Sequence, residues 1–374
     1  ELLLFMHSLR EIHWESLMAR ADYTATPEVI SQEEREKSQE IRIQFQQKGK
    51  KAELSRWLRL DWGAEIPEPV IQDVVARLES EGDIEGAHRW ARLSPDARWQ
   101  TFSVAIFLGK EGKPCSVEGK AFARLPTGCR TDLKFHISGR FATTIDRDRL
   151  RTDDPLTRWA LAETERMLSQ MPERLKRLSR FTPPMWAIFP ARKEVQDLFA
   201  PAVDALCKTL SEGAYFHGDD GEFHPQSDVY LAHSPDLYEL LRNSDLREVT
   251  GNPEARWVHP ELRGGEPREV IHSLGVPSVE AHYILRWLQN KEAVWFEAHS
   301  DEWLGRLYRY LAGHEGLRAG VKEIPIVRLH TCRCVRPGEA LLPPERFPEA
   351  LERYARYLPL VNLSICQKKE TAEA

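Results

Sequence analysis

Runs of alternating and helically spaced apolar residues divide the first part of the chain into elements. Residues 40–45 (EIRIQF) and 53–60 (ELSRWLRL) alternate as strands do, and the polar turn QQKGKK joins them into a predicted hairpin. Residues 69–80 have the spacing of an amphipathic helix, with Pro69 at its start and Gly82 just past its end. Two more apolar strands flank the turn GKEGKP. The first half is therefore predicted to be rich in β-structure.

The strand pattern continues into residues 135–155, FHISGRFATTIDRDRLRTDDP, and ends there in a run of charge. Odd-numbered residues from 135 to 141 are expected on one face and even-numbered residues on the other. Asp154 is expected to cap a helix that begins at Pro155. Arg147, Arg149 and Arg151 therefore lie at a strand-to-helix junction, where exposed N–H groups and arginine suit phosphate or carboxylate. The alternative is a solvated loop whose charges pair with one another.

The second half is predicted to be rich in helix, near 195–211, 235–243, 278–290, 301–312 and 347–357. Two segments, 216–231 (FHGDDGEFHPQSDVYL) and 329–342 (LHTCRCVRPGEALL), share one layout: a strand, a tight polar turn, a strand, a proline, an acidic residue and an apolar pair. A proline and an apolar helical pattern follow each copy, as SPDLYELL and FPEALERY. The pattern predicts two hairpin-helix units.

The first copy contains the types of residue that bind metals, with His217, Asp219, Asp220, Glu222 and His224 inside eight residues. The sequence favours a hairpin instead, because Asp-Gly is a strong turn signal and the second copy has no aspartate. In the second copy, Cys332 and Cys334 are expected as neighbours on one strand face and as structural cysteines, since no fourth metal ligand is evident. No metal site is predicted.

The first residues, ELLLFMHSLREIHW, read as a short helix that leads into a strand. Its apolar residues crowd one side of the predicted helix. Two interpretations remain open: the helix docks on a neighbouring module, or it packs on the core of this chain.

Length and composition narrow the class of protein. A chain of 374 residues exceeds the usual size of one core, so two or more domains are expected. Six cysteines without paired spacing, and no secretory signal pattern, favour a reducing, cytoplasmic setting. The net charge of −6 argues against a general nucleic-acid binder, and no apolar run is long enough to span a membrane. Residues 124–180 are the basic exception, with thirteen Lys and Arg against eight Asp and Glu.

Residues 119–151, GKAFARLPTGCRTDLKFHISGRFATTIDRDRLR, resemble the segment that follows the ATP-binding module in sacsin-type proteins. The correspondence falls on the Leu-Pro and Thr-Gly pairs at 125–128 and on six further positions: Leu133, His136, Gly139, Phe141, Ala142 and Arg147. The opening LLLFMHSLREI is similar to the element that closes the ATP-binding module, and DEWLGRLYRYLAG with IPIVRL resembles a recurrent element of these chains.

The resemblance implies a Bergerat-type ATP-binding module, of the kind shared by heat-shock chaperone ATPases, MutL and gyrase. Its Asn helix, its DxGxG motif and its Gly-rich lid would precede residue 1, and none of them is found in this sequence. In the related proteins a basic residue of the following segment touches the terminal phosphate. That role falls here on Arg147 in DRD, as the catalytic candidate, with Arg149 and Arg151 as further nucleotide contacts. Many sacsin-like chains have two adjacent arginines, whereas Asp148 separates Arg147 from Arg149 here.

These observations lead to an α+β architecture with three parts: a docking helix over 1–13 from the end of the ATP-binding module, a β-rich transducer-like domain over 14–180, and a helical domain with repeated hairpin-helix units over 181–374. The function expected from the resemblance is the coupling segment of a chaperone-type ATPase.

The chain itself would hold no cofactor and would not be an enzyme alone; ATP and Mg²⁺ would bind the parent protein. The alternative is a non-catalytic scaffold or client-binding module. A metal-dependent nucleic-acid enzyme is supported by neither charge nor ligand spacing. Partners would be the ATP-binding module and client proteins, without membrane or nucleic acid.

Overall fold

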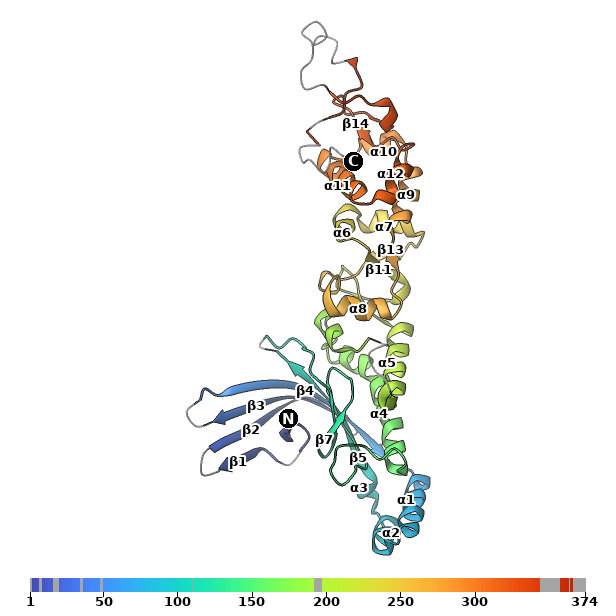
Figure 1. Ribbon diagram of the computed structural model, residues 1–374. Helices are drawn as coiled ribbons and strands as arrows, with labels where there is room; N and C mark the ends of the chain where they lie inside the picture. The colour runs from blue at the N-terminus through green and yellow to red at the C-terminus, as the bar shows by residue number, and fades with distance from the viewer. Residues whose placement is uncertain are drawn as a thin grey trace. The chain divides into compact units, whose positions relative to one another are not determined.

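The structure is a computed structural model in which the chain forms two compact units, Glu1–Tyr215 with Gly264–Gly275, and Phe216–Arg263 with Val276–Ala374. The described residues are 2–6, 9–15, 20–33, 36–47, 50–109, 111–191, 197–343, 357–362 and 364–365. Among them, no helix is both long enough and apolar enough to cross a bilayer. The first unit carries a large sheet and the second carries short strands between helices, so the predicted α+β class is confirmed (Figure 1).

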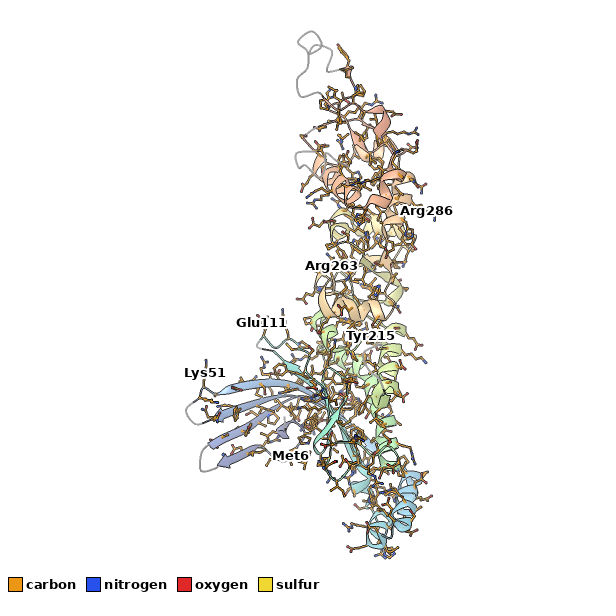
Figure 2. The ribbon with its side chains drawn as sticks, viewed as in Figure 1. Met6, Lys51, Glu111, Tyr215, Arg263 and Arg286 are labelled. Atoms are coloured by element: carbon orange, nitrogen blue, oxygen red, sulfur yellow. The ribbon has the colours of Figure 1, made fainter. Side chains whose placement is uncertain are left out.

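The first unit is built on an eight-stranded sheet in the order β1-β2-β3-β4-β5-β8-β6-β7. Neighbouring strands are antiparallel except for β6 and β8, which run parallel. The predicted hairpin of residues 40–60 forms β3 and β4, and Figure 2 shows Lys51 and Glu111 on turns at the end of the sheet away from α4. The strands are β1 (Glu11–Glu15), β2 (Arg20–Gln32), β3 (Glu36–Gln47), β4 (Glu53–Glu65), β5 (Trp99–Leu108), β6 (Lys120–Ala123), β7 (Leu125–Arg130) and β8 (His136–Ser138).

Helix α4 (Pro155–Arg177) covers one face of this sheet. The ring of Trp159 meets Phe102 edge-on, with 5.4 Å between ring centroids, and the Arg174 guanidinium lies 4.3 Å from the Trp62 ring centroid. Helix α5 (Ala200–Glu212) packs along α4, so the first unit extends past residue 180. The unit also contains α1 (Glu68–Ser80), α2 (Ile84–Ala91), α3 (Pro95–Arg98), α8 (Gly265–Ser273) and the 3₁₀ turns η2 (Pro183–Ile188) and η3 (Asp197–Phe199).

The opposite face of the sheet is covered by the N-terminal residues. Here the structure differs from the expected helix, because the described residues before β1, which begins at Glu11, form the 3₁₀ turn η1 (Leu2–Leu4) and no longer helix. Leu3, Leu4 and Phe5 are buried with apolar residues of β3, β4 and β6, and the Phe5 ring lies 4.6 Å from that of Phe122. Tertiary packing on the sheet, rather than helical propensity, fixes this segment.

The second unit places short strands between helices. Strand β11 (Val229–Ala232) pairs in parallel with β12 (Arg256–Trp257) and with β13 (Ser278–Val279). The helices predicted near 235–243, 278–290 and 301–312 are present, whereas residues 344–356, with FPEALERY, lie outside the described residues. The other elements are β9 (Ala214–His217), β10 (Phe223–Pro225), β14 (Val327–Arg328), β15 (Cys334–Val335), α6 (Asp236–Leu240), α7 (Asn243–Thr250), α9 (Ala281–Gln289), α10 (Ala293–Glu297), α11 (Asp301–Ala312), α12 (Glu315–Val321), η4 (Gln226–Asp228), η5 (Pro260–Leu262) and η6 (Pro337–Glu339).

Both predicted hairpins occur in this unit. In the first, Gly221 adopts a left-handed φ of 83° between β9 and β10. In the second, the turn lies between β14 and β15, and Cys332 has a φ of 64°. Cys332 therefore sits in the turn while Cys334 is buried on β15, rather than both on one strand face. The strand alternation around them is interrupted because Leu329 N–H bonds the Arg333 carbonyl and closes the turn.

Candidate functional site

The arginines singled out by the sequence lie on a short loop, residues 143–150, which we call the arginine loop. Its ends are joined by an antiparallel bridge between Thr143 and Leu150. Thr144 accepts a hydrogen bond from the N–H of Arg147 and donates its own N–H to Arg149, each at 3.0 Å. The loop is thus a small hairpin that leaves the sheet shortly before α4, which agrees with the predicted strand-to-helix junction.

Arg147 holds this hairpin against the sheet. Its guanidinium donates to the carbonyl oxygens of Ala123 (3.0 Å), Leu125 (3.1 Å) and Pro126 (3.4 Å), all at the corner between β6 and β7. Its backbone has a left-handed φ of 62°, which costs an L-residue of order 1–3 kcal/mol and persists only where the surroundings enforce it. The sequence assigned the phosphate contact to Arg147, whereas the structure uses this guanidinium to bind backbone carbonyls.

A backbone contact also ties the loop to β7. The N–H of Gly128 donates to the carbonyl of Arg147 at 2.9 Å. A β-carbon at residue 128 would lie 2.8 Å from Asp148 Oδ1 and 3.0 Å from its Cα, so the loop and the strand approach too closely for a side chain. Glycine is therefore required here for close approach, which explains the glycine of the Thr-Gly pair in the sequence motif.

The other two arginines differ in their partners. Arg151 is ion-paired with Asp153 (3.4 Å) and with Glu81 (3.5 Å), and the bond to Asp153 is the main reason why its pKa is raised. Arg149 is exposed, and no hydrogen bond or ion pair engages its guanidinium within the described part of the chain. Arg149 is therefore the loop arginine whose donors are open to a ligand.

Asp146 of the loop forms hydrogen bonds within the loop itself. Asp146 accepts hydrogen bonds from the hydroxyl of Thr144 and the N–H of Asp148, and these bonds, with that of Thr144 the largest contribution, lower the pKa of Asp146. Such a bond is an Asx-type turn contact. Asp146 therefore shapes the loop through these hydrogen bonds, and the nearby charge of Arg149 is the smallest of the contributions to its lowered pKa.

The helix that follows begins as the sequence predicts. Asp154 caps α4, accepting a hydrogen bond from the N–H of Leu156 at 2.8 Å, and Pro155 occupies the first helical position. Asp154 also pairs with Arg77 at 3.2 Å, which ties the start of α4 to α1. On its helix side the junction is thus held by both a cap and an ion pair.

The acidic and histidine-rich segment 217–224 is a hairpin whose polar groups bind one another. The Asp220 carboxylate accepts from His224 at 3.0 Å and from Arg256. Partial burial acts to raise the pKa of Asp220, but the hydrogen bonds from His224, Glu222 N–H and Arg256 outweigh it, and the pKa is lowered. The described residues contain no group of three or more acidic, histidine or cysteine side chains placed to hold a metal ion.

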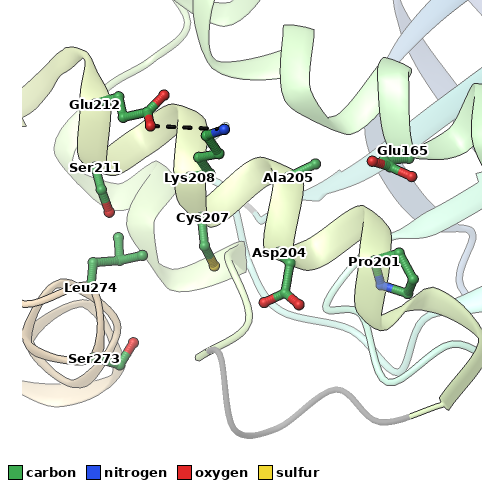
Figure 3. A pocket seen from close by; sticks show the side chains of 10 residues that line it. All are labelled: Glu165, Pro201, Asp204, Ala205, Cys207, Lys208, Ser211, Glu212, Ser273 and Leu274. Atoms are coloured by element: carbon green, nitrogen blue, oxygen red, sulfur yellow. Dashed lines mark ion pairs between the residues drawn. The ribbon is translucent and has the colours of Figure 1, made fainter.

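A groove of about 610 Å³ lies among α4, α5 and α8 of the first unit (Figure 3). Glu165, Asp204 and the ion pair of Lys208 with Glu212 contribute its charged groups. Cys207 and Leu274 supply part of its apolar wall. Nothing in this groove was singled out by the sequence, because its residues come from three separate helices.

Comparison with known proteins gives no relative: no family model, no curated protein and no solved structure matches this chain.

Proposed function

We propose that this chain is the coupling segment of a sacsin-like, chaperone-type ATPase, acting in the cytoplasm. ATP and Mg²⁺ would be bound by an ATP-binding module of the same protein. The arginine loop would present guanidinium groups to the terminal phosphate when the two parts close together. Client proteins would be its other partners. The proposal rests on the sequence resemblance of residues 119–151 and on the geometry of the loop.

The observation that carries the proposal is the open guanidinium of Arg149 on a loop that is otherwise fixed. Arginine donates paired, charge-assisted hydrogen bonds to phosphate oxygens, and the effect is strongest where negative charge develops during reaction. Arg151 would first have to break its ion pairs with Asp153 and Glu81 before it could bind a phosphate. Arg149 has no such ion pair to break among the described residues, so binding through Arg149 avoids that free-energy cost.

Arg147 has a different part in this proposal. To contact phosphate it would have to leave three carbonyl oxygens, so its first role is to position the loop that carries Arg149. Asp148, which separates the two arginines in the sequence, is the residue that packs against Gly128 and so helps to hold the loop on β7.

The alternative function, a scaffold that binds client proteins, has one observation in its favour. Large apolar side chains are exposed in the described part of the second unit, among them Val294 and Leu342. Scattered exposed apolar residues are common on protein surfaces, so this observation weighs less than the open arginine.

One experiment separates the two functions. In the intact parent protein, Arg147, Arg149 and Arg151 are replaced together by Met, with Arg89→Met, at an exposed position on α2, as the control for removing a surface arginine. For a coupling segment, ATP hydrolysis falls in the triple variant while ATP binding and the control are unchanged. For a scaffold, hydrolysis is unaffected, and client binding falls instead when Val294 and Leu342 are replaced by Ser.

A further inference from the structure

Two arginines that the sequence did not single out stand beside each other at the ends of parallel strands. Strands β6 and β8 pair in parallel with Ala121 opposite Ile137 and Phe122 opposite Ser138. Gly139 N–H then bonds the Phe122 carbonyl at 3.0 Å and continues this pairing. Arg124 directly follows β6 and Arg140 lies two residues past β8, so both arginines leave the same end of this parallel pair, close enough for the charge of Arg124 to act on Arg140.

The two charges are close and have no counter-ion among the described residues. Within the described part of the chain, no hydrogen bond or ion pair engages the guanidinium of Arg124 or of Arg140, and the Nε of Arg140 is buried without a hydrogen-bond partner. Burial, followed by the nearby charge of Arg124, lowers the pKa of the half-buried Arg140. A like charge nearby and partial burial both disfavour the charged form of a guanidinium, so this arrangement is unfavourable unless an anion binds.

The backbone on both sides of the pair is fixed. Arg124 has a left-handed φ of 62°, and the carbonyls of Ala123 and Leu125 that flank it are both bonded by Arg147. On the other strand, a β-carbon at Gly139 would lie 2.9 Å from the rings of Phe102 and Phe141, so the residue before Arg140 is tightly packed. Neither arginine can therefore be moved away from the other by a simple shift of its strand end.

We propose that Arg124 and Arg140 form a binding site for a phosphoryl dianion. Two unneutralised guanidinium groups balance two negative charges, which favours phosphate over a singly charged carboxylate. The planar fork of arginine also matches phosphate oxygens with paired hydrogen bonds. A partly buried anion at this position would remove the repulsion between the two arginines. Salt would weaken this interaction less than it weakens an ion pair on the surface.

This inference does not rest on the proposed ATPase function. The site consists of residues of this chain alone, and Arg149, on which the proposed function depends, is not part of it. A phosphoryl group could thus bind here whether or not the parent protein hydrolyses ATP.

The test is calorimetric titration of the 374-residue chain with inorganic phosphate and pyrophosphate, with acetate as the monoanion. We expect phosphate and pyrophosphate to bind more tightly than acetate, and Arg140→Met to weaken pyrophosphate binding at least ten-fold. Arg124→Met, at an exposed position, should do the same if Arg140→Met does not fold. Arg89→Met, at an exposed position on α2, is the control and should bind as the unaltered chain does. The proposal is overturned if pyrophosphate does not bind, if neither substitution weakens its binding, if acetate binds equally well, or if Arg89→Met weakens pyrophosphate binding as much as Arg140→Met does.

Discussion

The Nη2 of Arg147 donates to the carbonyl oxygen of Ala123 at 3.0 Å, which joins the arginine loop to the corner between β6 and β7. Two further carbonyls accept from the same guanidinium. Since hydrogen bonds to a charged group contribute roughly 1.5–3 kcal/mol, we expect Arg147→Ala to lower the free energy of unfolding by about 2 kcal/mol. Urea denaturation of the chain measures this change.

The left-handed backbone at Arg147 provides a matched comparison. Glycine adopts a φ of 62° without strain, so Arg147→Gly should be less destabilising than Arg147→Ala by about 1 kcal/mol. Arg149→Ala, at an exposed position where no described residue bonds or ion-pairs with the guanidinium, should change stability by no more than about 0.5 kcal/mol. If Arg147 and Arg149 substitutions have equal effects, the carbonyl contacts of Arg147 do not hold the loop.

Gly128→Ala should displace the arginine loop without removing any arginine. The new methyl group would meet the backbone of Asp148, and overpacking of this kind costs about 1–3 kcal/mol. Thermal unfolding measures the loss. Gly316→Ala is the control, because no atom lies within 4 Å of a β-carbon there and alanine suits a helix better than glycine. An unchanged melting temperature for Gly128→Ala would contradict the close approach of the loop to β7.

A buried ion pair fixes the N-terminal residues on the sheet. Arg59 and Asp61, with side chains only 3% and 6% exposed, lie 3.0 Å apart, and Arg59 also donates to the Leu4 carbonyl. Asp61→Ala leaves the Arg59 charge buried and should cost about 3–5 kcal/mol in chemical denaturation. Glu85→Ala, which breaks an exposed pair with Arg89, should cost no more than about 0.5 kcal/mol. Equal costs for the two variants would mean that the Arg59 pair is solvated.

Acid should weaken the second unit partly through Glu248. Hydrogen bonds from Lys291 and then from Trp287 lower the pKa of Glu248 below its ordinary 4.5. A carboxyl whose pKa is lowered in the folded state stabilises the fold above the unfolded pKa, and this contribution is lost as pH falls through the folded pKa. Glu248→Gln should therefore lose less stability than the unaltered chain between about pH 5 and pH 3, by a small amount because Glu248 is half exposed. Parallel pH curves would show that the Lys291 pair contributes nothing.

The elements that the sequence predicts well are those determined by local chemistry. Asp154 and Pro155 start α4 because a cap and a proline act within the first turn of a helix. Gly221 makes its hairpin because glycine adopts the left-handed conformation of the turn, which is also a local property. The expected helix at the N-terminus depends on what the apolar residues meet, and the sheet face around Phe122 holds them in another conformation.

The contacts of the site residues are harder to predict from the sequence than the fold is. The pattern identifies the charged loop, but only the structure shows that Arg147 binds carbonyls while Arg149 is open. Alternation places Arg140 on a strand face, yet its closeness to Arg124 follows from the parallel pairing of β6 and β8, which no local pattern contains.

Steady-state ATP hydrolysis by the intact parent protein is the most direct test of the proposed function. Arg149→Met should lower turnover by about ten-fold or more, equivalent to roughly 1.4 kcal/mol of barrier, with ATP affinity and stability unchanged. Arg147→Met should lower turnover together with stability, and Arg89→Met should alter neither. Normal turnover in both Arg147→Met and Arg149→Met would contradict the account and leave the arginine loop as solvated surface.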